Sequence, residues 1–213
     1  YPALERSSST LFWHDHAMGI TRLNVYAGLI GGVYLVQDPK LEAKLNLPTG
    51  PYEIPLVISD KTFDIDGQLV YSISNSSSAH PKWKSTFLGN VIVVNNKVWP
   101  YLEVEPTKYR FKIVIASDTR SYSLKLVSAE CPVDPGPAFY QVGSDQGYLP
   151  QVIVLNDPAD PTSPQLLLSP AERADIVIDF TDYAPGTEFI LANTANAPYP
   201  GGNPPDPATV GIL

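Results

Sequence analysis

The sequence is poor in cysteine and in positive charge. Cys131 is the single cysteine among the 213 residues, so it has no partner for a disulfide within the chain. Lysine and arginine number 14 against 22 aspartates and glutamates, and the formal net charge is −8. Because nucleic-acid binding needs clustered positive charge, we expect no nucleic-acid partner.

Long apolar runs and targeting segments are also lacking. The longest apolar stretch, Val25 to Val36, is interrupted by three glycines. It is shorter than the roughly 20 residues that cross a bilayer as a helix, so we expect no membrane partner. The chain opens on Tyr1 without an initiator methionine or a signal peptide, which leaves processing, truncation or a fragment open.

Turn-forming residues are abundant, with 22 prolines and 14 glycines spread along the chain. They separate many short segments rich in β-branched and aromatic residues, and no long segment has a helical period. We therefore predict an all-β sandwich or barrel with strands in residues 10–16, 28–37, 53–63, 90–99, 101–106, 109–117, 121–129, 139–145, 151–156, 165–170, 173–180 and 188–194. An Asp-Gly turn at residues 64–68 predicts a hairpin between residues 53–63 and 69–72, followed by a polar loop in 72–81.

The strand pattern indicates three parts. Residues 53–213 have enough strands for a complete β-sandwich, and the proline-rich residues 39–52 are typical of a linker with a short turn of helix. Residues 1–38 contain only two predicted strands, which cannot form a stable unit alone. We therefore expect residues 1–38 to be the last strands of a preceding domain, and the chain to be a middle fragment of a larger protein.

Two of the three histidines, His14 and His16, are separated by one residue in a predicted strand. Side chains at i and i+2 share a face of a strand and lie roughly 7 Å apart. This spacing suits two neighbouring metal ions that each take one imidazole. Asp15 faces the other way and is expected to orient a neighbouring group.

An ordinary structural role for the histidine pair stays open on spacing alone, as does a zinc site. Two ligands are too few for a tight site, which normally has three or four. His80 is expected at the surface, and Cys131 has no histidine nearby in the sequence. Any metal site around His14 and His16 therefore requires ligands from elsewhere.

Long segments of the chain also resemble a known family. The run TLFWHDHAMGITRLNVYAGLIGGVYLVQDP resembles the end of the first cupredoxin domain of laccase-type multicopper oxidases, nearest to the bacterial spore-coat laccases. VNNKVWPYLEVEPTKYRFKIVIASDTRSYSL resembles the second cupredoxin domain, and VGSDQGYLPQ, LSPAERADIVIDF and ILANTA continue the resemblance in the same order. It covers nearly the whole chain and implies a cupredoxin-like Greek-key β-sandwich.

The resemblance implies that His14 and His16 each bind one of the paired type 3 coppers of a trinuclear cluster. Trp13, Asp15 and Met18 are implied to surround and orient these ligands. The type 1 and type 2 copper sites are not encoded in this chain, and Cys131 is not assigned to either. Copper is therefore the expected cofactor, and dioxygen, a small aromatic reductant and the remaining cupredoxin domains are the expected partners.

For the parent protein, the resemblance implies one-electron oxidation of phenols or aromatic amines and reduction of dioxygen to water. The location implied is extracellular, at the cell surface or in a spore coat. The chain alone is expected to be inactive because it lacks most copper ligands. The alternative is a non-catalytic metal-binding or scaffold module, whereas a hydrolase is disfavoured because no Gly-x-Ser-x-Gly motif is present.

Further positions take expected roles from the same resemblance. Thr86 and Leu88 are candidates for lining the substrate pocket, although an ordinary strand role is equally open. Leu88 and Ala197 stand where some spore-coat laccases have a disulfide. Structural roles are expected for the remaining residues that match the family pattern, namely Arg22, Asn24, Tyr26, Gly28 and Arg120.

Overall fold

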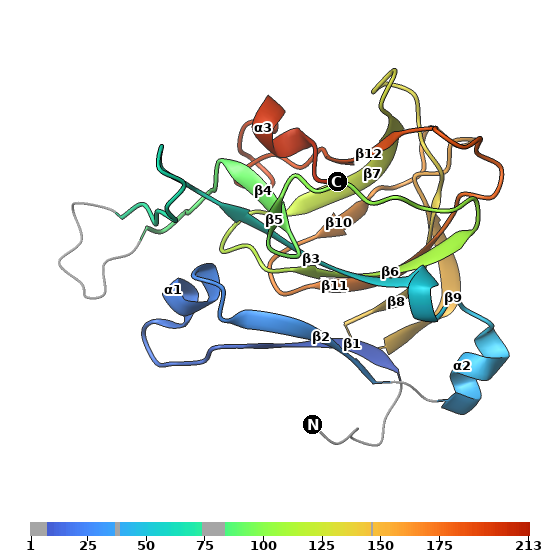
Figure 1. The fold of residues 1–213 in the computed structure, drawn as a ribbon, viewed down its shortest axis with the longest axis horizontal. Helices are drawn as coiled ribbons and strands as arrows, with labels where there is room; N and C mark the ends of the chain where they lie inside the picture. Colours follow the sequence, from blue (N-terminus) through green and yellow to red (C-terminus); the bar gives the residue numbers. More distant parts are fainter. Residues whose placement is uncertain (1–7, 37–38, 74–83, 146) are drawn as a thin grey trace.

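The computed structural model describes residues 8–36, 39–73, 84–145 and 147–213. Two β-sheets face each other, and a separate two-stranded hairpin lies against the outside of the larger sheet (Figure 1). None of the helices within these residues is long and apolar enough to cross a membrane. His80 and most of the predicted 72–81 loop lie outside the described residues.

The larger sheet has seven strands, in the spatial order β5 (Lys97–Val98), β4 (Val91–Val94), β3 (Glu53–Lys61), β6 (Lys108–Ile115), β11 (Arg173–Asp179), β8 (Phe139–Ser144) and β9 (Gly147–Leu155). The smaller sheet has three strands, in the order β10 (Leu166–Leu168), β7 (Tyr122–Ser128) and β12 (Phe189–Asn193). Strands β3 and β6 pair in parallel, whereas the other paired strands are antiparallel. The predicted all-β sandwich is confirmed.

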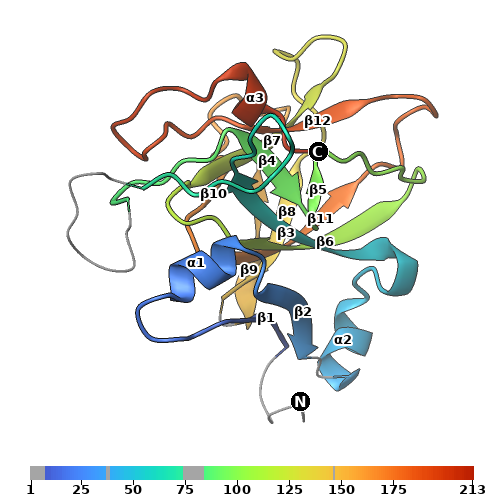
Figure 2. The same cartoon turned by 60° about the vertical axis from the view of Figure 1, so that its left-hand side comes forward.

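The hairpin consists of β1 (Ser9–His14) and β2 (Ile30–Val36), with the short helix α1 (Thr21–Tyr26) between them. Helix α2 (Pro39–Leu45) and a 3-10 turn (Gly50–Tyr52) occupy the predicted linker, and α3 (Pro207–Val210) lies near the C-terminus. Figure 2 shows α1 between the hairpin and the sandwich. The assignment of the hairpin to a preceding domain stays a prediction.

The core lies between the two sheets and follows the alternation of the strands. On β6, Tyr109, Phe111, Ile113 and Ile115 are buried and belong to one apolar cluster. The other sheet contributes its own inward side chains to this cluster, including Tyr122, Leu124 and Leu126 of β7 and Leu191 of β12. Alternation along single strands therefore accounts for the position of the core.

The opposite face of β6 carries two buried cations, Arg110 and Lys112, which are 0% and 1% exposed. The Arg110 guanidinium donates to both carboxylate oxygens of Asp175, at 2.8 and 2.6 Å, and to Glu42 Oε2 at 3.1 Å. Lys112 Nζ lies 3.2 Å from Glu53 Oε1 and 3.5 Å from Asp175 Oδ2. We call these five residues the buried charge cluster.

This cluster ties α2 to the sandwich, because Glu42 is a residue of α2. Tyr148 of β9 joins it by donating to Glu42, and it accepts from Arg110 at 2.8 Å. Burial lowers the pKa of Arg110, but the hydrogen bonds and charge of Asp175 outweigh burial and leave this pKa above its ordinary value. Burial and the bond to Glu42 both raise the pKa of Tyr148.

The predicted strand 90–99 is divided into β4 and β5 by a turn at Asn95 and Asn96, and two other predicted strands are absent. Residues 101–106 form no strand: Pro100 and Pro106 bracket them, and residues 101–105 are all exposed. The hairpin predicted at the Asp-Gly turn is reduced to an isolated bridge between Phe63 and Leu69. Beyond that bridge, Tyr71 stacks on Phe87 at a ring separation of 4.7 Å instead of continuing a strand.

Candidate metal centre

The two histidines lie together at the end of β1. His14 is the last residue of that strand, and His16 follows it in the loop, so the strand ends two residues earlier than predicted. Their ring centroids are 5.8 Å apart with an interplanar angle of 27°, and both side chains are exposed. The pair therefore presents two neighbouring imidazoles to the outside, closer together than an extended strand would hold them.

Asp15 shapes the loop between the two imidazoles. Its carboxylate oxygen Oδ2 accepts from the Ala17 backbone N–H and from Asn24 Nδ2, both at 3.0 Å. These two bonds lower the pKa of Asp15, with a smaller contribution from the neighbouring histidines. Asp15 is thus a carboxylate that orders the loop of residues 15–20 between β1 and α1, here called the histidine loop.

The backbone of Asp15 also fixes the ring of His14. His14 Nδ1 lies 2.6 Å from the Asp15 carbonyl oxygen. A proton on Nδ1 donates to this oxygen, and the lone pair then resides on Nε2, the nitrogen free to bind a metal. The contact therefore selects the tautomer that can bind a metal through Nε2.

Asn24, for which the sequence indicates a structural role, holds the Asp15 carboxylate. It lies on α1, nine positions after Asp15, and no local motif links the two. Thr21, at the start of α1, also donates to the Ala17 carbonyl oxygen at 2.8 Å. Helix α1 therefore holds the histidine loop by two hydrogen bonds, to Asp15 and to Ala17.

Trp13 and Met18 differ in their surroundings. The Trp13 indole packs over Gly31 of β2, where an added Cβ would lie 2.6 Å from Trp13 Cζ2, so glycine makes room for the ring. Met18 is 99% exposed. The described residues do not bury Met18, and its predicted packing around the site stays a prediction.

The donor set fits copper in kind, because imidazole is a suitable copper ligand. In number, it is incomplete. Among residues 8–36, 39–73, 84–145 and 147–213, no group of three or more histidine, cysteine, aspartate or glutamate side chains is placed to hold a metal ion. The pair therefore suits one part of a site that other ligands complete.

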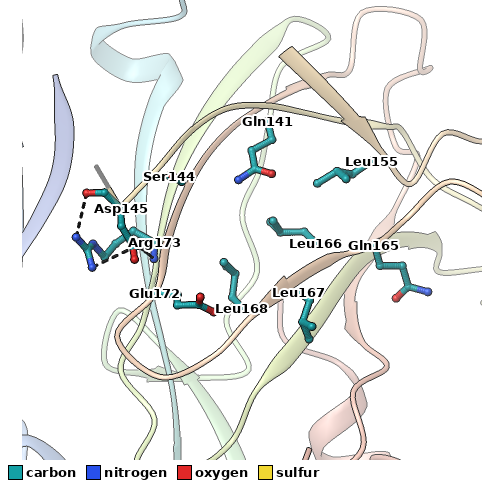
Figure 3. Close-up of a pocket in the computed structure, with 10 residues that line it drawn as sticks. All are labelled: Gln141, Ser144, Asp145, Leu155, Gln165, Leu166, Leu167, Leu168, Glu172 and Arg173. Atoms are coloured by element: carbon teal, nitrogen blue, oxygen red, sulfur yellow. Dashed lines mark hydrogen bonds and ion pairs between the residues drawn. The ribbon is translucent and has the colours of Figure 1, made fainter. Parts of the chain in front are cut away.

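A cavity of about 320 Å³ adjoins the pair between the hairpin and the sandwich, with His14, Arg22, Tyr26 and Asp118 among its lining residues. A second pocket, of about 380 Å³, opens between β8 and β10 and contains neither histidine (Figure 3). Here Arg173 pairs with Asp145 at 3.3 Å and also donates to the Thr10 carbonyl oxygen of β1. Arg173 therefore fastens the early part of β1 to the sandwich.

Thr86 and Leu88, the candidate pocket residues, lie on either side of the buried Phe87 and are half-buried. Neither residue lines the two cavities described above. Their role in substrate binding stays a prediction. Cys131 is exposed and free, away from the histidine pair in sequence.

Helix α1 is attached to the sandwich beside Lys61. The Lys61 amine donates to the Tyr26 carbonyl oxygen and lies 4.5 Å from the centre of the Tyr26 ring. Burial lowers the pKa of Lys61 from 10.5 to about 8, against the opposing effect of Asp60. Lys61 is therefore a half-buried lysine that loses its proton at a lower pH than an exposed lysine does.

We expect this lysine to make the free energy of unfolding rise with pH between about pH 8 and pH 10. Lys61 there binds a proton less often in the folded chain than in the unfolded chain, because folding lowers its pKa. With allowance for the partial exposure of the amine, the rise should be about 1–2 kcal/mol. Urea unfolding of the wild-type chain and of Lys61→Met, at about pH 8 and about pH 10, measures this rise in the free energy of unfolding. An equal pH dependence in the two proteins would refute the lowered pKa of Lys61 as its cause.

The chain is similar in sequence to known laccases and multicopper oxidases. No protein-family model matches it. A laccase of Bacillus subtilis (strain 168) is 48% identical over 199 residues, which are 92% of this chain and 35% of the relative. Multicopper oxidase LPR1 of Arabidopsis thaliana is 38% identical over 202 residues, 94% of this chain and 32% of the relative. The chain thus spans about a third of the length of these relatives.

Solved structures agree with the sequence matches. McoA multicopper oxidase from Aquifex aeolicus has a TM-score of 0.71 and 34% identity, covering 88% of this chain and 37% of that chain. A laccase from Pediococcus acidilactici has a TM-score of 0.70 and 26% identity, covering 94% of this chain and 37% of that chain. The predicted cupredoxin-like fold and the predicted resemblance are both confirmed.

Proposed function

Because this chain belongs to the multicopper oxidase family along nearly its whole length, we propose that it supplies His14 and His16 to the paired type 3 coppers of a laccase-like oxidase. The observation that carries the proposal is the exposed, stacked imidazole pair, 5.8 Å apart, inside a chain that matches laccases over 92% of its length. The remaining ligands, including those of the type 1 and type 2 coppers, belong in this proposal to other parts of the parent protein.

When bound, the coppers supply centres that accept electrons one at a time and deliver them to dioxygen. The proposed overall reaction takes one electron and one proton from each of four phenols or aromatic amines. With one dioxygen, these four electrons and four protons form two waters, and four organic radicals remain. The phenolic or amine substrate class is inferred from the relatives named as laccases.

The residues of this chain hold and orient the two imidazoles. His14 donates Nδ1–H to the Asp15 carbonyl oxygen, which leaves Nε2 as the nitrogen free to bind copper, and the Asp15 carboxylate holds the loop through Ala17 and Asn24. The exposure of the two imidazoles leaves room for ligands from another part of the protein. In this proposal the hairpin completes a first cupredoxin domain, residues 39–52 link it to the second, and the parent acts outside the cell, at its surface or in a spore coat.

Oxygen uptake tests this function. The copper-loaded parent protein should consume dioxygen in the ratio of one molecule to about four one-electron oxidations of a phenol, without release of hydrogen peroxide. The purified 213-residue chain should show no turnover above that of free copper, because two imidazoles are too few for a tight site. Steady phenol oxidation by the chain alone, or peroxide as the main product of the parent, would contradict the proposal.

A non-catalytic metal-binding or scaffold module is the second candidate. The observation that favours it is the shortage of further ligands among the described residues. Metal analysis separates the two functions: a parent protein purified without copper, and unable to take it up, supports the module.

A further inference from the structure

The histidine loop is connected to the sandwich through one helix. Asp15, between the two imidazoles, is held by Asn24 of α1 at 3.0 Å. Two residues later, Tyr26 ends the same helix, and it is the one residue of α1 that is buried. A short path of covalent and hydrogen bonds therefore leads from the imidazoles to Tyr26.

Tyr26 is inserted into the sandwich side of this contact. Its hydroxyl donates to the Val70 carbonyl oxygen at 2.6 Å and accepts from the Thr62 backbone N–H at 2.9 Å. Its ring packs edge-on against Phe87 and Tyr71, with centroid separations of 4.8 and 5.1 Å. The side chain is 6% exposed, so both its polar end and its apolar ring are matched by the sandwich.

Lys61 reinforces the same contact from β3. Its amine donates to the Tyr26 carbonyl oxygen, one of the carbonyl groups that the end of a helix leaves without an intrahelical partner. The end of α1 is thus held by side-chain, ring and backbone contacts together.

Another connection between hairpin and sandwich is made earlier in β1. Arg173 donates to the Thr10 carbonyl oxygen at 3.3 Å, and its guanidinium carbon lies 5.6 Å from the Phe12 ring centre. These contacts fix the strand that leads to His14 but touch neither Asp15 nor α1. The loop that carries His16 is bonded instead to α1 and, through the Asp15 backbone N–H, to the Leu29 carbonyl oxygen at 2.8 Å.

We propose that Tyr26 is a positioning residue for the His14–His16 pair, through which the sandwich sets the relative orientation of the two imidazoles. The effect of this positioning on copper binding rests on the proposed function of the pair. The positioning itself concerns the metal-free chain. The two can therefore be tested separately.

The first test uses the 213-residue chain without metal. Tyr26→Phe removes the hydroxyl and keeps the ring, and Lys61→Met removes the amine; Tyr122→Phe is the matched control. Tyr122 is 0% exposed and its hydroxyl bonds to Ser117 at 2.8 Å, so the control also loses a buried phenolic hydroxyl, but away from α1. Nuclear Overhauser cross-peaks between the ring protons of His14 and His16 report the orientation of the pair.

We expect the wild-type chain and Tyr122→Phe to show these cross-peaks, and Tyr26→Phe and Lys61→Met to lose at least about half of their intensity while the chain stays folded. If Tyr26→Phe does not fold, Lys61→Met decides. Cross-peaks of full intensity in the folded variants, or none in the wild-type chain, would overturn the proposal.

The second test uses the parent protein and copper ions alone. Groups that orient metal-binding histidines typically contribute 10–100-fold to metal affinity, so Tyr26→Phe should weaken copper binding at the pair by about tenfold, and Tyr122→Phe should leave it unchanged. If wild-type His14 and His16 bind no copper, the proposed function fails, and the cross-peaks still decide the positioning role. Equal copper affinity in Tyr26→Phe and wild type would overturn the inference.

Discussion

Replacing Asp175 by asparagine is expected to lower the free energy of unfolding by about 3–5 kcal/mol, because it leaves two buried cations without their shared carboxylate. Asp175 accepts two hydrogen bonds from Arg110, at 2.8 and 2.6 Å, and lies 3.5 Å from Lys112 Nζ. Arg110 and Lys112 are almost fully buried, so water cannot take over the role of the lost charge. Urea unfolding followed by circular dichroism measures the change.

The same pair of strands provides a matched control. Asp179, also on β11, pairs with Lys108 of β6 at 3.5 Å, but their side chains are 36% and 62% exposed. Exposed ion pairs contribute little, so Asp179→Asn should change the free energy of unfolding by no more than about 1 kcal/mol. Similar losses in the two variants would show that the buried charge cluster is not a principal source of stability.

The sequence predicted most of the sandwich and none of the buried charge cluster. Alternation on β6 marks Arg110 and Lys112 as pointing away from the core, and a strand pattern alone assigns such positions to solvent. Arg110 is instead paired with Glu42 and Tyr148, which lie 68 and 38 residues away from it in the sequence. No local pattern specifies contacts at that separation.

For the candidate site too, the sequence predicted the local arrangement but not the tertiary contacts. The i, i+2 spacing of His14 and His16 placed the two imidazoles together, and the rings do lie side by side. The early end of β1 was missed because Asp15 turns the chain by bonding to Asn24, a tertiary contact without a motif. The anchoring of α1 was missed for the same reason, since Tyr26 reaches Thr62 and Val70 of a distant segment.

Replacing His14 or His16 by alanine in the parent protein is expected to abolish oxidase activity, because dioxygen reduction in the proposed function needs both coppers of the pair. In the proposed function, each substitution removes one ligand from one copper of the pair. A site with three or four ligands binds its metal poorly when one ligand is removed. The neighbouring copper should be lost as well, since in the proposed function the two coppers form one paired site. His80→Ala, which removes the third histidine of the chain, should retain full activity.

The most direct test of the proposed copper role is the copper content per molecule of the parent protein, measured for the wild type, His14→Ala, His16→Ala and His80→Ala after identical copper loading. We predict that His14→Ala and His16→Ala each lose the paired coppers together, and that His80→Ala keeps the wild-type content. Wild-type copper content in His14→Ala and His16→Ala would contradict the assignment of this pair as copper ligands.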